Sequence, residues 1–529
     1  MVRTFYEYRP SMHRSPVIAK QMVATSQPLA AQAGLKILLE GGNAVDAAIA
    51  TASTLTVVEP TMNGIGSDAF AMVYKNGNLF GLNASGKSPA TWTPKRFSNF
   101  SQLPTEGWES VTVPGAVSGW VTLSKRFGKL PFEQVLRPAI EFARQGFHVS
   151  PIVAYQWELQ SSRFVGNSNF VEAFMPNGHA PKAGDLFLSK TQGDSLEKIA
   201  NSHGQAFYVG ELAEKIVTDS HAHGSALSHD DLAKHEAHWI EPMKTKYKNC
   251  ELCELPPNGQ GIAALIALGI LDEFDLENLG DNTAQSIHIQ VEAMKLALSD
   301  VYSYISDLNS MPFEPFLMLD KEYLKKRAQM IDLNNSSSFK CGDLGGSNTV
   351  YLASADRDGM MVSFIQSNYN GFGSGVVVPK TGISLQNRAA GFTLDPDHPN
   401  CVDGGKRPFH TIIPGFLFLE NSQPMSFGVM GADMQPQGHV QIVVKVVDFN
   451  YDVQAAAGAP RWKITKDNHL NIEEGMNSAA VDGLLKKGHK VRMLPYGSLE
   501  FGAAQLIKNI DGGYVGGSEP RRDGLIAGY

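Results

Sequence analysis

The stretch that decides the fold is "GGSNTVYLASADRDGMMVSFIQSNYNGFGSG", residues 345–375. Two runs rich in apolar and β-branched residues, 349–355 and 360–367, flank the polar turn sequence DRDG at 356–359. This pattern predicts a β-hairpin. Glycines crowd both ends of the hairpin and give the backbone a freedom that a plain hairpin does not need. The first strand residue is a threonine, Thr349.

Thr349 is a candidate nucleophile. If the peptide bond before it is cut, its hydroxyl lies beside its own free α-amine, which titrates near ~7.7–8.0 and can act as a general base. The chain can make this cut itself, because Thr349 Oγ1 can attack the carbonyl of Asn348 and form an ester that water opens. Such a reaction needs a strained, mobile bond, and the preceding "LGGSN" supplies glycines for it.

The hairpin also predicts partners for this threonine. With the turn at 356–359, Thr349 faces a residue between 366 and 368, so the Ser367 hydroxyl comes within reach. A developing oxyanion needs paired backbone N–H donors, which glycine-containing turns provide. The candidates are "GVMGAD" at 428–433, which opens a helix-like stretch, and "GFGSG" at 371–375. A plain buried hairpin without chemistry also fits this pattern.

Composition narrows the function classes. The chain has 529 residues, 43% hydrophobic and 19% charged, with a net charge of -8 and no basic block that would suit a nucleic acid. The longest apolar run, which starts at Ile262, is far shorter than the ~20 residues that a membrane span needs. The first twenty residues hold no apolar signal region, and there are only four cysteines. We therefore expect a cytoplasmic protein without nucleic-acid or membrane partners.

Hydrophobic periodicity predicts an α+β protein. The chain is expected to be mostly helical from about 115 to 345 and to return to strands after 349. A strand pair with an Asn76-Gly77 turn is expected before that region. Further helices are predicted at 28–40, from Asn43 or Asp46 to 58, and near 433–447, 452–457 and 476–488. With no repeat and no linker, one compact body with two sheets and covering helices is favoured.

Two glycine motifs suggest phosphate binding but lack the required context. "GLNASGKS", residues 81–88, matches a P-loop letter for letter, yet Pro89 and Pro94 follow where a helix should begin. "NGIGSDA", residues 63–69, is a loose G-x-G-x-x-A without a strand-turn-helix context, and we interpret it as a tight turn. A P-loop nucleotide-binding protein using Lys87 stays as the alternative from a different class.

Two further clusters are possible metal ligands. Cys250 and Cys253 form a C-x-x-C on an alternating, strand-like run without a second ligand pair nearby. His288 and Glu292 are four residues apart on a predicted helix, where a packing pair is the simpler interpretation without a third ligand. No G-x-S-x-G sequence occurs, so the common serine-hydrolase motif is excluded. No cofactor and no metal are predicted.

Over nearly its whole length the sequence resembles the γ-glutamyltransferases (γ-glutamyltranspeptidases), which are N-terminal-nucleophile hydrolases. Four segments match the family in order: "MVATSQPLAAQAGLKILLEGGNAVDAAIA", "VPGAVSGWVTLSKRFGKLPFEQVLRPAIEFARQGF", "GKRPFHTIIP" and "SEPRRDGLIAGY". The resemblance implies an αββα four-layer sandwich with additional helices from the first half of the chain. It also implies self-cleavage into a large subunit, 1–348, and a small one, 349–529, that together form one compact domain.

The resemblance assigns roles to the catalytic positions. Thr349 is the expected nucleophile, Ser367 stands where the family has a supporting threonine, and cleavage falls between Asn348 and Thr349. Gly431 and Ala432 stand at two glycines whose amides form the oxyanion hole. The implied reaction is transfer of an acyl group, through an acyl-threonine, to water or to an amine.

The expected substrate site departs from the family. Ser85 stands where the family has the arginine that holds the α-carboxylate, and His410 and Thr411 replace a serine pair. Arg388 stands where an acidic or amide partner of the α-amine is expected, unless it is only a surface charge. Asn368 and Asn370 are also expected to bind substrate.

These differences resemble the branch described as γ-glutamyltransferase-like enzymes or as cephalosporin (glutaryl) acylases. The expected donor is a γ-glutamyl or related acyl amide, and further oligomerisation of the two subunits stays open. A catalytically inactive, unprocessed member with a binding role is the remaining alternative.

Overall fold

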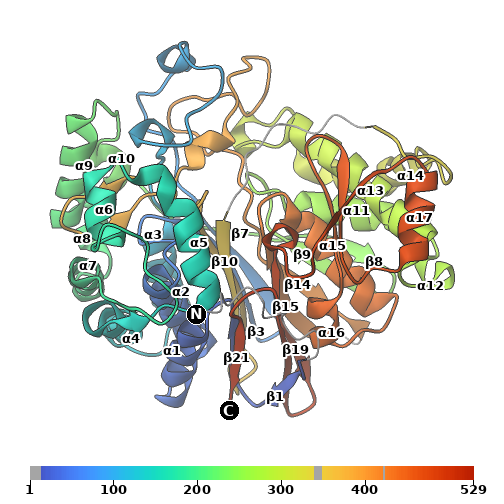
Figure 1. Cartoon of the computed structure of the whole chain (residues 1–529), viewed down its shortest axis with the longest axis horizontal. Coiled ribbons are helices and arrows are strands. Elements are labelled where there is room, and N and C mark those ends of the chain that lie inside the picture. Colours follow the sequence, from blue (N-terminus) through green and yellow to red (C-terminus); the bar gives the residue numbers. More distant parts are fainter. Residues whose placement is uncertain (1–13, 339–347, 421–422) are drawn as a thin grey trace, which may run out of the picture.

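The structure is a computed structural model that describes residues 14–338, 348–420 and 423–529. Two antiparallel sheets lie face to face at its centre, and helices cover the outer face of each (Figure 1). The four-layer αββα sandwich that the resemblance implies is therefore confirmed.

The first sheet contains the predicted hairpin, and we call it the nucleophile sheet. Its seven strands lie in the order β21-β2-β10-β11-β3-β4-β7, with β10 and β11 forming the hairpin. The strands are β2 (Met22–Thr25), β3 (Asp68–Lys75), β4 (Asn78–Ala84), β7 (His238–Ile240), β10 (Asn348–Ala355), β11 (Met361–Tyr369) and β21 (Leu525–Gly528). Strands from both sides of Thr349 alternate in this sheet, so neither side forms it alone.

The second sheet also mixes the two parts of the chain. Its seven strands lie in the order β1-β20-β19-β15-β14-β9-β8. They are β1 (Val17–Ala19), β8 (Met243–Tyr247), β9 (Cys250–Glu254), β14 (Gly415–Phe418), β15 (Pro424–Met430), β19 (Ala503–Ile510) and β20 (Gly513–Ser518). The short strands β5 (Phe147–His148), β6 (Leu186–Phe187), β12 (Val377–Val378), β13 (Ile383–Ser384), β16 (Trp462–Ile464), β17 (His469–Glu473) and β18 (Lys490–Leu494) form three small sheets.

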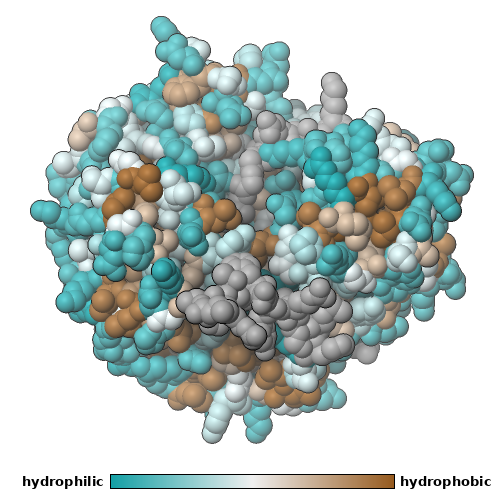
Figure 2. Space-filling view, viewed as in Figure 1, coloured by the Kyte–Doolittle hydropathy of each residue, from teal (hydrophilic) through white to brown (hydrophobic). Residues whose placement is uncertain are grey.

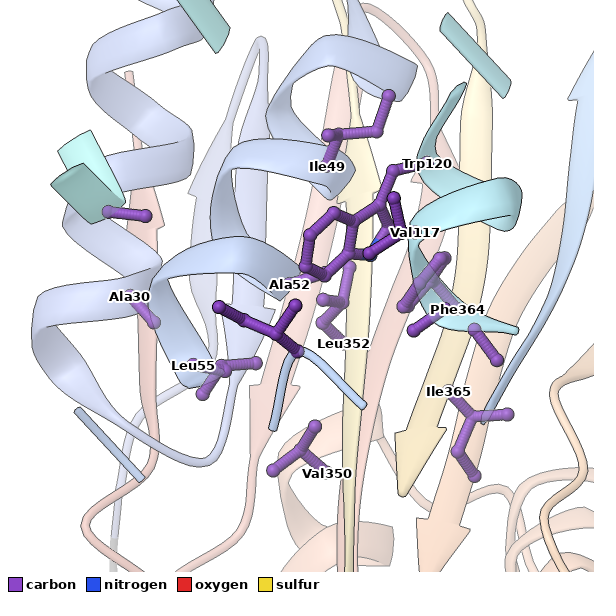
Figure 3. Packing of buried hydrophobic residues seen from close by; sticks show 14 of the residues in the cluster. Ala30, Ile49, Ala52, Leu55, Val117, Trp120, Val350, Leu352, Phe364 and Ile365 are labelled. Atoms are coloured by element: carbon purple, nitrogen blue, oxygen red, sulfur yellow. The ribbon is translucent and has the colours of Figure 1, made fainter. Parts of the chain in front are cut away.

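Helices from the first half of the chain cover the nucleophile sheet. α1 (Pro28–Leu39), α2 (Ala44–Val58) and α3 (Ala116–Phe127) pack directly on it. Figure 3 shows Val350 and Leu352 of β10 pointing toward α2. Farther out lie α4 (Phe132–Gln145), α5 (Pro151–Ser161), α6 (Ser168–Phe174), α7 (Lys190–Asn201), α8 (Gln205–Tyr208), α9 (Glu211–Ala222) and α10 (His229–Ala233).

The helices on the second sheet come from the middle and the end of the chain. α11 (Ile262–Leu271), α15 (Met434–Val447) and α16 (Val453–Gly458) pack on its strands. Around them lie α12 (Leu276–Leu279), α13 (Ala284–Tyr304), α14 (Lys321–Ala328) and α17 (Ser478–Lys486). Each helix predicted from periodicity is present within a few residues of its expected limits. The expectation of a mostly helical region from 115 to 345 missed β7 and β8, which are edge strands of the two sheets, whereas the strand-like run at Cys250 and Cys253 is present as β9.

Local sequence explains why the helix beneath β10 begins where it does. Asn43 caps α2 by accepting from the amides of Val45 and Asp46, and Asp46 accepts in return from the Asn43 amide. Such a capping box satisfies backbone donors that the first helical turn leaves free. Both residues named as possible starts therefore act together at this one helix end.

The viewed face of the molecule is mainly hydrophilic, with hydrophobic residues in separate patches (Figure 2). Among the helices of the described residues, none combines the length and the apolar character needed to cross a membrane.

Candidate active site

Thr349 lies near the start of β10, in the middle of the nucleophile sheet. Its side chain is fully buried, and its Oγ1 donates a hydrogen bond of 3.1 Å to Ser367 Oγ. The β10–β11 pairing shifts register between Asn348 and Val350, so Thr349 occupies an irregularity in the ladder. The contact between the two hydroxyls that the hairpin pattern predicted is thus present.

The hydroxyl pair faces the second sheet. Residues two apart on a strand point to the same face. Ser363, four residues before Ser367 on β11, donates to the Phe427 carbonyl of β15, which fixes the direction of this face. Val350 points the other way, toward the helices (Figure 3). Thr349 Oγ1 and Ser367 Oγ therefore lie on the face of the nucleophile sheet that packs against the second sheet.

Asp68 extends this row by one strand. It is the cross-strand partner of Ser367 in the β11–β3 pairing, so both side chains share one face. Asp68 is fully buried, and its carboxylate accepts from the amides of Gly86 and Gly115 and from His410 Nε2 at 3.2 Å. Burial raises the pKa of Asp68 to about 7, against the lowering effect of the Arg388 charge.

The sequence analysis did not single out Asp68. The "NGIGSDA" motif was interpreted as a tight turn, and that turn is present, with the Ser67 amide bonded to the Gly64 carbonyl. An acid at the end of a glycine-rich turn, directly before an apolar strand, was the available signal. Its significance depends on β3 pairing with β11, which no local pattern reveals.

His410 is a buried partner of this carboxylate. Its Nδ1 accepts from the Ile412 amide, which assigns the ring proton to Nε2, the atom that faces Asp68. Burial and the Arg388 charge lower the pKa of His410 well below its usual value, so the ring is neutral. Both ring nitrogens thus have protein partners, and the substrate-binding role expected for His410 stays a prediction.

Arg388 is a buried cation with unused donors. Its side chain is only 1% exposed, its Nη1 donates to Thr411 Oγ1 at 2.9 Å, and its guanidinium lies over the Tyr369 ring. Among the described residues, its Nε and Nη2 have no hydrogen-bond partner. Burial lowers the pKa of Arg388 to about 10, while the Asp68 charge acts in the opposite direction. The alternative that Arg388 is a surface charge is therefore wrong.

A second cation lies at Ser85. The Ser85 side chain is buried and bonds Asn83 Oδ1, while its carbonyl accepts from Arg407 Nε at 3.0 Å. The Arg407 amide donates to Asp307, so this arginine lies beside its own counter-charge. The sequence comparison implied that the chain had lost the cation at this position. The structure corrects that inference, because a distant segment supplies one.

Asn368 and Asn370 have different surroundings. Asn368 is buried, accepts from the Ser67 hydroxyl and donates to Ser384, so its amide links two turns. Asn370 Oδ1 is buried without a partner among the residues that the structure describes. Of the two, only Asn370 offers an unused polar atom to a ligand.

The turn after β15 supplies the candidate oxyanion donors. Gly431 and Ala432 have φ values of 127° and 55°, and within the described chain their amides make no hydrogen bond. A positive φ is unfavourable for alanine, so the surrounding contacts hold Ala432 in this turn. Gln260 Nε2 donates to the carbonyls of both Ala432 and Thr411 and ties the turn to the Arg388 site.

The other proposed oxyanion turn, "GFGSG", is less suitable. The Gly373 amide donates to the Asn370 carbonyl, and the Gly375 amide donates to the Phe372 carbonyl. Because these donors already close the turn, the turn at Gly431 and Ala432 is the better candidate.

The remaining motifs have structural explanations. The first half of the P-loop match lies within β4, and the next helical element along the chain is the short 3-10 turn Pro94–Phe97, so the helix that must follow a P-loop directly is missing. Cys250 and Cys253 are free, buried residues of β9.

The His288–Glu292 pair gains a third neighbour that the sequence did not reveal. His489 lies close to both residues, with its Nε2 2.8 Å from His288 Nδ1. Glu292 forms a buried ion pair with Lys295. Because His288 and His489 are hydrogen-bonded to each other and Glu292 is paired with Lys295, we interpret the cluster as a packed hydrogen-bond network.

The fold and the site together define a class of protein. A hydroxyl residue lies near the start of a central strand of an αββα sandwich, and a serine contacts it. A glycine-containing turn, whose amides make no hydrogen bond to the residues that the structure describes, lies at the end of the facing β15. This is the architecture of N-terminal-nucleophile hydrolases. The family model described as gamma-glutamyltranspeptidase matches residues 30–529. The chain belongs to this family, and it is a γ-glutamyltransferase-like amidohydrolase or acyltransferase.

Similar proteins have several described activities. The glutathione hydrolase-like YwrD proenzyme of Bacillus subtilis is 34% identical over 98% of this chain and all of its own length. The oxamate amidohydrolase proenzyme of Klebsiella pneumoniae is 32% identical with the same coverage. The crystal structure of cephalosporin acylase from Bacillus halodurans is 45% identical over 99% of this chain and 98% of its own, with a TM-score of 0.94.

Proposed function

We propose that Thr349 is the nucleophile and that cleavage between Asn348 and Thr349 releases its amine. Thr349 Oγ1 would attack the Asn348 carbonyl, the amide nitrogen would take the hydroxyl proton, and water would hydrolyse the resulting ester. The buried hydroxyl pair formed with Ser367 supports this role, because a positioned hydrogen bond fixes the direction of the attacking oxygen.

In turnover the same oxygen attacks the carbonyl of the substrate amide. The Thr349 α-amine takes the hydroxyl proton and passes it to the departing amine, which leaves an acyl-threonine. Water or another amine then attacks this ester and releases the acyl group. The free amides of Gly431 and Ala432 are the proposed donors to the oxyanion in both steps.

We further propose that the acyl group ends in a carboxylate held by Arg388. The observation that carries this proposal is the pair of buried donors, Nε and Nη2, that have no partner among the described residues. These two N–H groups lie side by side on one edge of a guanidinium, the geometry that binds a carboxylate in a two-pronged pair. Leaving them unpaired in a closed site is costly, which favours a ligand that pairs them.

A glutaryl group satisfies this site better than a γ-glutamyl group. The α-ammonium of γ-glutamyl would meet the charges of Arg388 and Arg407, whereas glutaryl carries no such cation. The similar proteins include both a cephalosporin acylase and a glutathione hydrolase-like proenzyme, so the comparisons favour neither acyl group. One observation favours γ-glutamyl as the second candidate, namely the buried carboxylate of Asp68 beside Arg388, which could face an ammonium.

The parts before and after the cut are proposed to stay together as one domain. Support comes from the sheets, since strands β2, β3, β4 and β7 from residues 1–348 alternate with β10, β11 and β21 from residues 349–529. Separating the two parts would expose the interior of both sheets to water.

The nucleophile is tested on purified protein in a denaturing gel. Wild type should run as two chains, with an N-terminus at Thr349 by mass spectrometry. Thr349→Ala should run as one chain without amidase activity, and Thr349→Ser, which keeps a hydroxyl, should still be cut. Cleavage of Thr349→Ala at the same bond would overturn the autocatalytic role.

The acyl group is tested with γ-glutamyl and glutaryl anilides. Wild type should give kcat/KM for glutaryl at least equal to that for γ-glutamyl. Arg388→Ala should change this ratio, while Arg357→Ala, at the exposed hairpin turn, should leave it unchanged. A strong wild-type preference for γ-glutamyl, or an unchanged ratio in Arg388→Ala, would contradict the proposal.

A further inference from the structure

Asp68 is the charge that balances Arg388 in the described residues. Asp68 is the carboxylate whose charge acts on Arg388, and both side chains are almost completely buried. The nearby Arg407 has its own counter-charge in Asp307. Each of the two guanidiniums is therefore matched by one carboxylate, and the site around Arg388 is electrically balanced before any ligand enters, once Asp68 has lost its proton.

A carboxylate that pairs with Arg388 upsets this balance. The buried site would then hold one cation and two anions, and an uncompensated buried charge is expensive. Asp68 has limited means to disperse the excess, because in the described part of the chain its oxygens accept from two amides and from a neutral His410. The simplest compensation is the capture of one proton by the hydrogen-bonded pair of Asp68 and His410.

We propose that binding of an acidic acyl group at Arg388 is coupled to uptake of one proton by the Asp68–His410 pair, so that Asp68 sets how this binding depends on pH. This inference rests on the proposed carboxylate site. The charged and titratable groups that face Asp68 are His410, Arg388, Arg407 and Tyr208. Tyr208 and the two arginines do not take up or release a proton near neutral pH, because the pKa of Tyr208 is shifted upward and both arginines stay charged.

The position of Asp68 connects this coupling to the reaction. Asp68 is paired across the strands with Ser367, and Ser367 bonds Thr349. The titrating carboxyl thus lies one strand from the hydroxyl that positions the nucleophile. Burial raises the pKa of Asp68 to about 7, so the empty site loses its proton near neutral pH. Above that pH, each unit should weaken binding of a carboxylate ligand by about tenfold until the bound site also loses its proton.

The experiment measures glutarate binding to the purified, processed protein by calorimetry between pH 6.5 and 9. Glutarate itself stays ionised over this range, since carboxyl groups titrate near ~4. Titrations at pH 8 in two buffers of different ionisation enthalpy give the number of protons taken up. We expect close to one proton and a Kd that rises about tenfold from pH 7.5 to 8.5. Asp68→Asn should abolish the uptake and flatten the Kd profile.

The outcomes separate this inference from the function on which it rests. If glutarate binds wild type but not Arg388→Met, and no proton is taken up, the role of Asp68 is overturned while the carboxylate site stands. If glutarate does not bind, or binds equally well to Arg388→Met, the carboxylate site fails and the inference fails with it. Because proton uptake is measured on wild type, the result does not depend on whether Asp68→Asn folds.

Discussion

Arg521 and Arg388 are both buried to 1% exposure, yet their surroundings are opposite. Arg521 donates five hydrogen bonds, to Glu473, Glu519 and the carbonyls of Ala457 and Ala459, so every N–H group of its guanidinium is used. Arg388 makes one side-chain bond, to Thr411, and leaves Nε and Nη2 without partners in the described chain. Arg521 therefore ties distant segments of the fold together, whereas Arg388 has two donors that a ligand could use.

The carboxylates beside the two arginines differ in the same way. Burial alone would raise the pKa of Glu519, but the charges of Arg461 and Arg521 bring it down to about 2. Burial raises the pKa of Asp68 to about 7, and the Arg388 charge only partly opposes this. A complete ion network therefore holds its charges over the whole physiological range, whereas the incomplete pair titrates within it.

The largest expected effect is on stability at Arg521. Arg521→Met removes the partner of two buried carboxylates, Glu473 and Glu519, and should destabilise the protein by about 3–5 kcal/mol. A large fall in Tm in a thermal melt would show this. Arg492→Met, which removes an exposed arginine paired with Asp467, is the matched control and should leave Tm nearly unchanged. If both variants melted at the same temperature, the buried network around Arg521 would not stabilise the protein more than an exposed ion pair does.

The second effect separates activity from stability at Arg388. Arg388→Met removes two donors that have no partner in the part of the chain that the structure describes, but also the bond to Thr411 and the charge beside Asp68. Because Asp68 already has a raised pKa and can take up a proton in the variant, Tm should fall by less than in Arg521→Met. Turnover of a glutaryl anilide should fall roughly tenfold to a hundredfold in kcat/KM, as expected for loss of charged hydrogen bonds worth about 1.5–3 kcal/mol. A fall in Tm as large as that of Arg521→Met would identify Arg388 as a structural residue instead.

A smaller effect is expected at the single side-chain bond of Arg388. Thr411→Val keeps the volume but leaves Nη1 without its acceptor, so the guanidinium is less well oriented. KM for the glutaryl anilide should rise by a few-fold to about tenfold, as expected for a hydrogen bond worth about 0.5–1.5 kcal/mol, with kcat less affected. Thr411→Ser, which keeps the hydroxyl, should behave as wild type. Identical KM values in all three proteins would exclude an orienting role.

The finest test follows stability with pH. The pKa of Glu519 is lowered from 4.5 in the folded protein, so its stabilisation is complete above that value and is lost as pH falls toward about 2. The pKa of Asp68 is raised from 3.8, so the folded protein retains the proton longer and loses stability as pH rises from about 4 to about 7. The difference in Tm between Glu519→Gln and wild type should therefore change with pH mainly below about 4.5. The difference between Asp68→Asn and wild type should change mainly between about pH 4 and 7. If the Glu519 variant changed toward neutral pH and the Asp68 variant at acid pH, the contrast between the two carboxylates would be wrong.

Some parts of the site could be predicted because they depend on short-range geometry. A strand period of two and a turn of known length bring Thr349 opposite Ser367, and the two residues are only 18 positions apart. The oxyanion turn was also recognisable from its glycines before a helix. Asp68 and Arg407 could not be found in this way, because the motifs that contain them do not show which distant residues they meet. They become visible only when β3 pairs with β11 and when the segment after β13 folds back on Ser85.

The sequence by itself determined the hairpin and the hydroxyl near its start, since alternating hydrophobicity, turn residues and glycines act within a few residues of one another. The same patterns favoured two sheets with covering helices, and the four-layer sandwich was what the family resemblance implied. The sequence also determined that a cation stands at position 388. Only the tertiary structure decided what that cation does. Whether a guanidinium is a surface charge, a structural tie or a ligand site depends on burial and on how many of its donors find acceptors. Those acceptors come from segments that are distant along the chain and meet only after folding.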